Sequence, residues 1–107
     1  MTLPTTVTVG PFVYAVVEDP VSRNHQNRGE HDGTHVRINI APELSPQRKR
    51  VTFTHEVLHA LIDAAGRGRE GDTFTEEGLC DLLAPALVAL VRQNPDVIVY
   101  LTADDAD

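Results

Sequence analysis

The pattern of apolar and polar positions divides the chain into a first part with strand-like spacing and a second part with helical spacing. Thr5–Val9 and Phe12–Val17 are rich in β-branched and aromatic residues, and Gly10-Pro11 separates the two runs. This arrangement predicts two strands joined by a turn. Residues 35–41 alternate apolar and polar side chains and predict a third strand, whereas residues 19–33 are polar and turn-rich and predict a long loop or loose hairpin.

From Ser45 onward, apolar residues recur at steps of three and four, the spacing of one helix face. Serine is a favoured N-cap, proline suits the first helical position, and glycine can take the left-handed conformation that ends a helix. Ser45, Pro46 and Gly66 supply these signals, so a helix is predicted over residues 45–66. The residues on its periodic face are Val51, His55, Leu58, Ile62 and Ala65.

A second helix is predicted over residues 75–93, with acidic residues in its first turn and a periodic apolar run after them. Asn94-Pro95-Asp96 ends this helix and can start another, although residues 97–100 have the propensity of a strand. Residues 103–107 form an acidic tail. We therefore expect a single α+β domain of residues 1–107, in which a small twisted sheet of about three strands, within residues 1–41, packs on the two helices.

The first predicted helix contains His55-Glu56-Val57-Leu58-His59, which matches HExxH, the signature of zinc-dependent peptidases. Two histidines four residues apart lie on one helix face and can bind one metal ion together. Glu56 directly follows the first histidine, so its carboxylate can reach a water on that ion and act as general base. The motif predicts a Zn²⁺ site with His55 and His59 as ligands and Glu56 as the catalytic residue. The alternative is an ordinary amphipathic helix with two incidental histidines.

A catalytic zinc site has three protein ligands, so a third donor is needed elsewhere in the chain. The metzincin continuation is excluded, because Ile62 and Ala65 occupy the positions of its glycine and its third histidine. The first turn of the second predicted helix offers two carboxylates instead, Glu76 and Glu77.

Local roles distinguish these two carboxylates. Glu76 stands three residues after Thr73, the spacing of a capping box in which the acid bonds a backbone amide. Glu77 has no such local role, and Asp81 lies one turn further along the same face, where it can accept the spare ring N–H of a ligating histidine. We predict Glu77 as the third metal ligand with Asp81 as its supporting residue. Glu76 stays as the alternative ligand, because a helical wheel places it nearer the apolar stripe.

Together these residues resemble the gluzincin arrangement of thermolysin-type peptidases, with HExxH at 55–59 and Glu77-Gly78-Leu79-Cys80-Asp81 on a second helix. The run 82–87 and Asn94-Pro95 further resemble small phage- and prophage-encoded metallopeptidases of the ImmA/IrrE-like group, over about residues 34–101. The resemblance implies a minimal zincin, with a strand beside the cleft before the first helix and a short helix over residues 95–102. The residue that stabilises the oxyanion in larger relatives is not assigned by it.

Other polar residues are secondary candidates. His25, His31 and His35 are expected to be exposed in or beside the loop. His35 is the best placed of them for a metal or oxyanion role, because it adjoins the third strand. Tyr14 and Tyr100 are expected to pack in the core, although either can hydrogen-bond a developing oxyanion if it reaches the cleft.

Composition agrees with a small intracellular enzyme. The 107 residues carry a net charge of −7, which argues against nucleic acid as a partner. The sequence has no signal segment and no apolar run near the roughly 18 residues of a membrane span. We therefore expect no membrane partner and a cytoplasmic location, in the host cell if the chain is phage-encoded.

Cys80 is the single cysteine, which excludes an internal disulfide, and it is expected to be a buried core residue. Arg48-Lys49-Arg50 is expected to be a solvated face, with a contact to nucleic acid or an acidic substrate as the alternative.

The function predicted from these observations is that of a zinc metalloendopeptidase, which hydrolyses a peptide or protein substrate through a zinc-activated water. The substrate backbone is expected to run along the strand at 36–40. A non-catalytic zinc-binding interaction module and a latent peptidase, covered by its own N-terminal strands or loop, are the alternatives. The ligand set suits zinc, although nickel or cobalt can occupy such a site, and the oligomeric state is left open.

Overall fold

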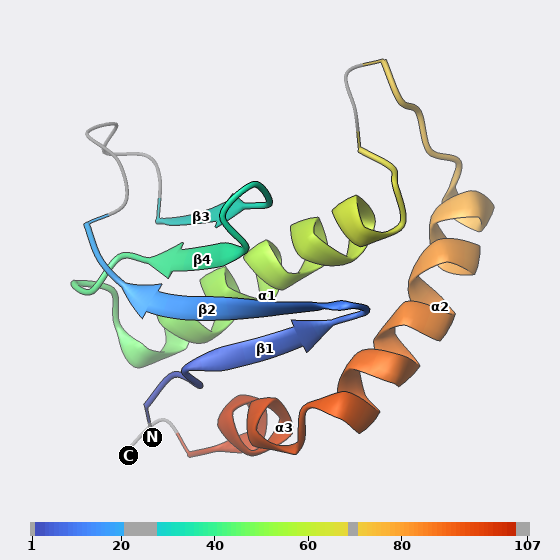
Figure 1. The fold of residues 1–107 in the computed structure, drawn as a ribbon. Coiled ribbons are helices and arrows are strands. Elements are labelled where there is room, and N and C mark those ends of the chain that lie inside the picture. Colours follow the sequence, from blue (N-terminus) through green and yellow to red (C-terminus); the bar gives the residue numbers. More distant parts are fainter. Residues whose placement is uncertain (1, 21–27, 69–70, 105–107) are drawn as a thin grey trace.

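The computed structural model describes residues 2–20, 28–68 and 71–104, which form a four-stranded sheet and three helices (Figure 1). The α+β class is therefore confirmed, although the sheet has one strand more than the three predicted. In chain order the elements are β1 (Thr6–Val9), β2 (Phe12–Glu18), β3 (Gly29–Asp32), β4 (Arg37–Ile40), α1 (Pro46–Ala64), α2 (Glu76–Gln93) and α3 (Pro95–Thr102).

The sheet has the order β1-β2-β4-β3 and is mixed. β1 and β2 form an antiparallel hairpin, in which Gly10 supplies the positive φ of 57° at the turn. β2 and β4 are parallel, and β3 returns antiparallel on the outer side of β4. The fourth strand lies within residues 19–33, where a long loop or loose hairpin was expected. Gly29-Glu30-His31-Asp32 has little strand propensity, and β3 forms because β4 offers it a hydrogen-bonding edge.

The third predicted strand is shorter than expected. Residues 35–41 were predicted as a strand, but Gly33 to Val36 form the turn between β3 and β4. Val36 has a φ of 53°, a conformation that a β-branched residue rarely adopts, and this ends the extended run before Arg37. β4 is also flanked by β2 on one side and β3 on the other, so its edges are not open to a substrate backbone as the sequence suggested.

Helix α1 packs its buried side against one face of the sheet and supplies much of the core (Figure 1). Ser45 caps the helix by accepting a hydrogen bond from the Arg48 amide, and Pro46 occupies the first turn, as predicted. Phe53 and Ala60 are fully buried on α1, where they meet Ile38 and Ile40 of β4 in the same core. Burying this face fixes the rotation of α1 about its axis, which decides where the remaining side chains of the motif point.

Helices α2 and α3 lie on the β1 side of the sheet, and the short terminal helix is present where the resemblance placed it (Figure 1). Asn94, which is 3% exposed, ties their junction to β1. Its side-chain oxygen accepts from the Thr8 amide at 2.8 Å, and its side-chain nitrogen donates to the carbonyls of Thr8 and Leu90. Most of α2 has little cover, since Leu90 is its one buried residue within the described chain.

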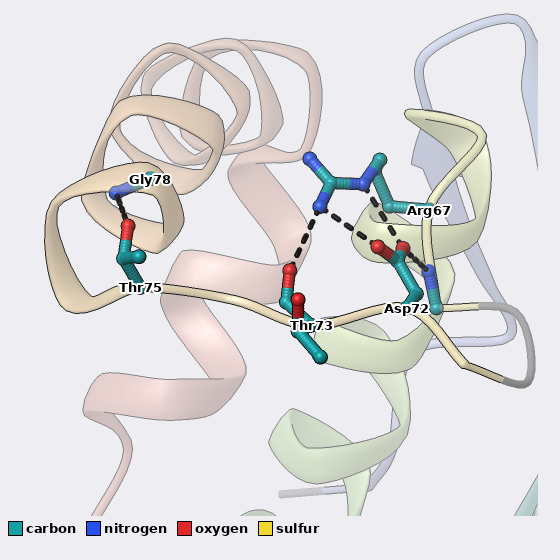
Figure 2. A network of polar contacts seen from close by, with 6 residues as sticks. Arg67, Asp72, Thr73, Thr75 and Gly78 are labelled. Atoms are coloured by element: carbon teal, nitrogen blue, oxygen red, sulfur yellow. Dashed lines mark hydrogen bonds and ion pairs between the residues drawn. The ribbon is translucent and has the colours of Figure 1, made fainter.

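The connector from α1 to α2 is organised by an Arg67–Asp72 ion pair (Figure 2). Two guanidinium nitrogens of Arg67 donate to the Asp72 carboxylate at 2.9 Å, and Arg67 also donates to the Thr73 carbonyl. The Arg67 side chain holds the pKa of Asp72 at about 2 through these bonds. Arg67 also lies over the Phe74 ring at 4.8 Å, so the chain entering α2 is held by both charge and packing.

The start of α2 differs from the predicted capping box. Thr75 is the N-cap and accepts from the Gly78 amide at 3.0 Å, whereas Thr73 bonds Arg67 through its carbonyl (Figure 2). Glu76 and Glu77 are consequently both in the first helical turn, where negative charge favours the helix dipole. The local role that set Glu76 apart from Glu77 is therefore absent.

Within the described part of the chain, no single helix combines the length and the hydropathy of a membrane span. Helices α2 and α3 reach both criteria when counted together, but the chain bends by 96° between them.

We expect Asn94→Ala to destabilise the fold by about 2 to 4 kcal/mol, because it leaves buried backbone groups of Thr8 and Leu90 without partners. Urea unfolding followed by circular dichroism measures this change. Gln93→Ala, at the exposed neighbouring position, is the control and should cost no more than about 0.5 kcal/mol. Equal stability of the two variants would remove Asn94 from its anchoring role.

Candidate metal centre

His55 and His59 lie one turn apart on the exposed side of α1, and their rings meet edge to face with centroids 4.8 Å apart. Their Nε2 atoms are 3.2 Å apart. Two nitrogens bound at 2.0–2.1 Å to one tetrahedral ion are separated by about 3.3 Å. The two imidazoles therefore already have the spacing that a shared zinc ion requires, and one oxygen of Glu56 lies within 4.8 Å of both.

Glu56 belongs to the buried side of the helix and is 6% exposed. Burial raises the pKa of its carboxyl group, and the neighbouring charge of Glu30 adds to the rise, while His55, His59 and His31 oppose it. A carboxylate in such surroundings holds a proton more readily than one in water. This is the property that a general base needs when it must accept a proton and later return it.

Strand β3 comes close to α1 because its first residue has no side chain. A Cβ on Gly29 would lie 2.7 Å from the Thr52 methyl carbon, 3.1 Å from Glu56 Cγ and 3.2 Å from the Asn39 carbonyl. Any larger residue would push the strand away from the helix or displace Glu56. Gly29 therefore sets the distance between the edge of the sheet and Glu56.

His31, two residues further along β3, adds a third histidine to this side of α1. Its ring stacks on that of His59 with centroids 6.4 Å apart and planes 13° apart. The Tyr14 hydroxyl is 3.0 Å from His31 Nε2. Burial raises the pKa of Tyr14, as does the negative charge of Asp63, so its phenol keeps a proton to donate to the imidazole.

The predicted residues of the second helix lie elsewhere. Glu77 and Glu76 are exposed in the first turn of α2, and Asp81 is exposed one turn further on. Among the described residues, the group of ligand atoms close enough to share an ion contains His55, Glu56 and His59. The structure thus brings together the motif itself, and Glu77 as third ligand stays a prediction.

The remaining secondary candidates have structural surroundings of their own. His35 lies in the β3–β4 turn, where its Nδ1 is 2.8 Å from the Asp32 carboxylate, and it is not in the metal-binding group. Tyr100 is buried against Phe53 and under Arg50, with burial raising its pKa. Cys80 is exposed on α2, so the expectation of a buried core residue is wrong. His25 lies outside the described residues.

The structure therefore favours His31 over His35 as the additional histidine of the site. The sequence favoured His35 because it adjoins the predicted third strand, but the side chain nearer the motif comes from β3. Strand β3 has no apolar alternation that would identify it. Gly29 and His31 are two residues apart and so lie on one face of β3, but this can be recognised only once the strand is known.

A hollow of about 360 Å³ adjoins the motif on the side toward the helix N-terminus. His55 and Glu56 are among its lining residues, so it adjoins the group that could hold a metal ion. The other described lining residues are Arg28 and Gly29 from the β3 side and Arg48, Val51 and Thr52 from α1.

Comparisons of the chain with protein-family models, curated proteins and solved structures gave no match.

We expect Zn²⁺ to stabilise the fold through these two histidines. At a free concentration 100 times Kd, a single site contributes about 2.7 kcal/mol, which raises Tm by about 10 °C or more in a chain of this size. Thermal unfolding with and without zinc measures the shift, and a chelator should reverse it. His55→Ala and His59→Ala should each remove it.

His35→Ala is the matched control, because this histidine is paired with Asp32 in the turn. It should keep the full zinc-dependent shift. A loss of the shift in His35→Ala equal to that in His55→Ala would mean that zinc binds at another place.

Proposed function

We propose that the chain is a zinc-dependent metallopeptidase of minimal zincin type, with Glu56 as general base. The observation that carries the proposal is the 3.2 Å separation of the His55 and His59 Nε2 atoms beside a buried carboxylate. An amphipathic helix with two incidental histidines has no reason to bury the acid between them. The same spacing and donor chemistry suit zinc, with nickel or cobalt as possible substitutes in the site.

Each group of the site has a definite part in this chemistry. A zinc ion held by His55 and His59 would supply a Lewis acid and a water of lowered pKa. Glu56 accepts the proton of the attacking water and passes it to the leaving amine. His31, kept in place by Tyr14, lies on the β3 side of His59 and can donate a hydrogen bond to the negative charge that develops on the carbonyl oxygen.

The position of β3 supports a peptide as the substrate. Strand β3 lies at the edge of the sheet beside α1, and among the described residues β4 is its one partner in the sheet. An extended peptide can add to such an edge through main-chain hydrogen bonds. This places the substrate backbone along β3 in place of β4, with the scissile bond over the motif.

The third ligand remains Glu77 in this proposal, with Asp81 in support. Both residues are on α2, which follows the connector that the Arg67–Asp72 pair organises (Figure 2). Most of α2 lacks cover, so a shift of this helix breaks few contacts. Movement of its first turn toward His59 would complete a three-ligand site.

A zinc-binding interaction module is the second candidate function. The exposed apolar side chains of α2 favour it, with Val88 56% exposed, Val91 49% and Leu87 38%. Such a surface is typical of partner binding. Catalysis by the zinc-loaded chain decides between the two functions.

We expect Glu56→Gln to lower the rate of peptide cleavage by about 10²- to 10⁴-fold, because the amide cannot accept the proton of the attacking water. Zinc content should be unchanged. Cleavage of a mixed peptide library, read by mass spectrometry with and without chelator, measures the rate. Glu43→Gln, in the exposed loop before α1, is the charge-matched control and should cleave like the parent chain. Undiminished cleavage by Glu56→Gln would exclude this residue as the base.

Replacing the two glutamates of α2 tests the third ligand. Glu77→Gln should weaken zinc binding by about 10-fold or more, by analogy with the loss of a supporting metal contact. Glu76→Gln should cost about 0.3 to 1 kcal/mol of stability, through the lost helix-dipole interaction, and leave zinc affinity unchanged. Titration with a competing zinc chelator gives both affinities. The reverse order would assign Glu76 as the ligand, and an equal loss would contradict a single third ligand.

A further inference from the structure

The hollow beside the motif has a basic rim that the proposed reaction does not use. Arg28 enters from the start of β3, where its carbonyl accepts the Ala41 amide at 2.8 Å, and Arg48 enters from the first turn of α1. Both arginines are exposed, and no ion pair joins either of them to a carboxylate of the described residues. Glu56 is the one carboxylate in the described lining.

The other two members of the basic cluster have structural partners, which sets Arg48 apart. Lys49 pairs with Glu18 at 2.8 Å. Arg50 donates to the Tyr100 carbonyl at 3.2 Å and lies over the Tyr100 ring. The cluster that the sequence suggested as a solvated face thus divides into two residues that hold α1 to its surroundings and one that lines the hollow.

The location of Arg48 is unfavourable for the helix itself. The N-terminus of a helix carries a partial positive charge and is stabilised by acidic residues, but the first turn of α1 contains none. Arg48 adds a positive charge to that end. A residue that opposes its local helix preference is expected where it serves a site, and the same helix dipole that disfavours Arg48 favours a bound anion.

Distances along the helix relate this rim to the reacting bond. Arg48 is seven positions before His55, a rise of about 10 Å along the helix axis. An extended peptide advances about 3.3 Å per residue. A group of the substrate held by Arg48 therefore belongs to a residue within about three positions of the bond that is cut.

We propose that this hollow is a specificity subsite, in which Arg28 and Arg48 bind a carboxylate of the peptide substrate. The assignment rests on the proposed peptidase function for its position relative to the cut bond. Arginine binds carboxylates through its planar fork of N–H donors, and two such side chains on one rim select an acidic group over its amide. The carboxylate comes from an Asp or Glu side chain or from the C-terminus of the peptide.

Binding by the full chain in the presence of chelator tests the subsite without any cleavage. The probes are fluorescein-labelled ten-residue peptide pools with blocked ends and uncharged random positions, with Glu or Gln at one central position. A third pool has Gln at that position and a free C-terminal carboxylate. Fluorescence anisotropy should show about 10-fold tighter binding of a carboxylate pool than of the blocked Gln pool.

Arg28→Gln and Arg48→Gln should each reduce this preference by about threefold or more, and the double variant should abolish it. Arg92→Gln, which removes the same charge from the far end of α2, is the control and should keep it. Tight binding of the Glu pool assigns a side-chain carboxylate, and tight binding of the third pool assigns a chain end. Equal affinity for all pools, or an equal loss in Arg92→Gln, overturns the subsite. Arg48-dependent binding of a labelled oligothymidylate that exceeds binding of every peptide pool also overturns it.

Cleavage by the zinc-loaded chain gives the second readout. Sites cut in a peptide library should have Asp or Glu, or a free C-terminus, enriched at one position within about three residues of the cut bond, and Arg48→Gln should lose the enrichment. Cleavage without enrichment overturns the subsite and leaves the peptidase. Absence of cleavage together with an arginine-dependent carboxylate preference overturns the peptidase and leaves a carboxylate-binding hollow.

Discussion

The buried side of α1 is the constraint on which the site depends. Phe53, Ala60 and Leu61 are enclosed in the core, so the helix cannot turn about its axis without exposing them. With that rotation fixed, His55 and His59 face outward with their Nε2 atoms 3.2 Å apart, and Glu56 faces inward. Five consecutive residues of one helix therefore present two exposed histidines that could share a metal ion and one desolvated acid.

Strand β3 is the second determinant of the site, although it is only four residues long. Its first glycine permits close approach to Thr52 and Glu56, and His31 reaches the ring of His59. Arg28, directly before the strand, lines the hollow beside the motif. Strand β3 and the residue before it therefore make one wall of the proposed active site. The outer edge of the strand is where a peptide backbone can pair.

The sequence predicted the features that are local. Ser45 and Pro46 mark the start of α1, the hairpin around Gly10 is present, and HExxH needs no tertiary information because its geometry is that of one helix turn. Features that depend on pairing between distant segments were missed. Strand β3 has almost no strand propensity of its own, and β4 starts late because Val36 adopts a positive φ in the turn that joins it to β3. Missing β3 also led to the choice of His35 over His31. The third ligand combines local and distant features. Glu77 is on a helix that was predicted, but the approach of this helix to α1 depends on the Arg67–Asp72 connector and on the metal.

The most direct test of the central claim is a crystal structure of the full chain grown with Zn²⁺. We expect one ion bound by the Nε2 atoms of His55 and His59 at 2.0–2.1 Å, with a carboxylate from the first turn of α2 as the third protein ligand and Glu56 beside the remaining position. Diverging imidazoles, or an ion bound at another place, would contradict it.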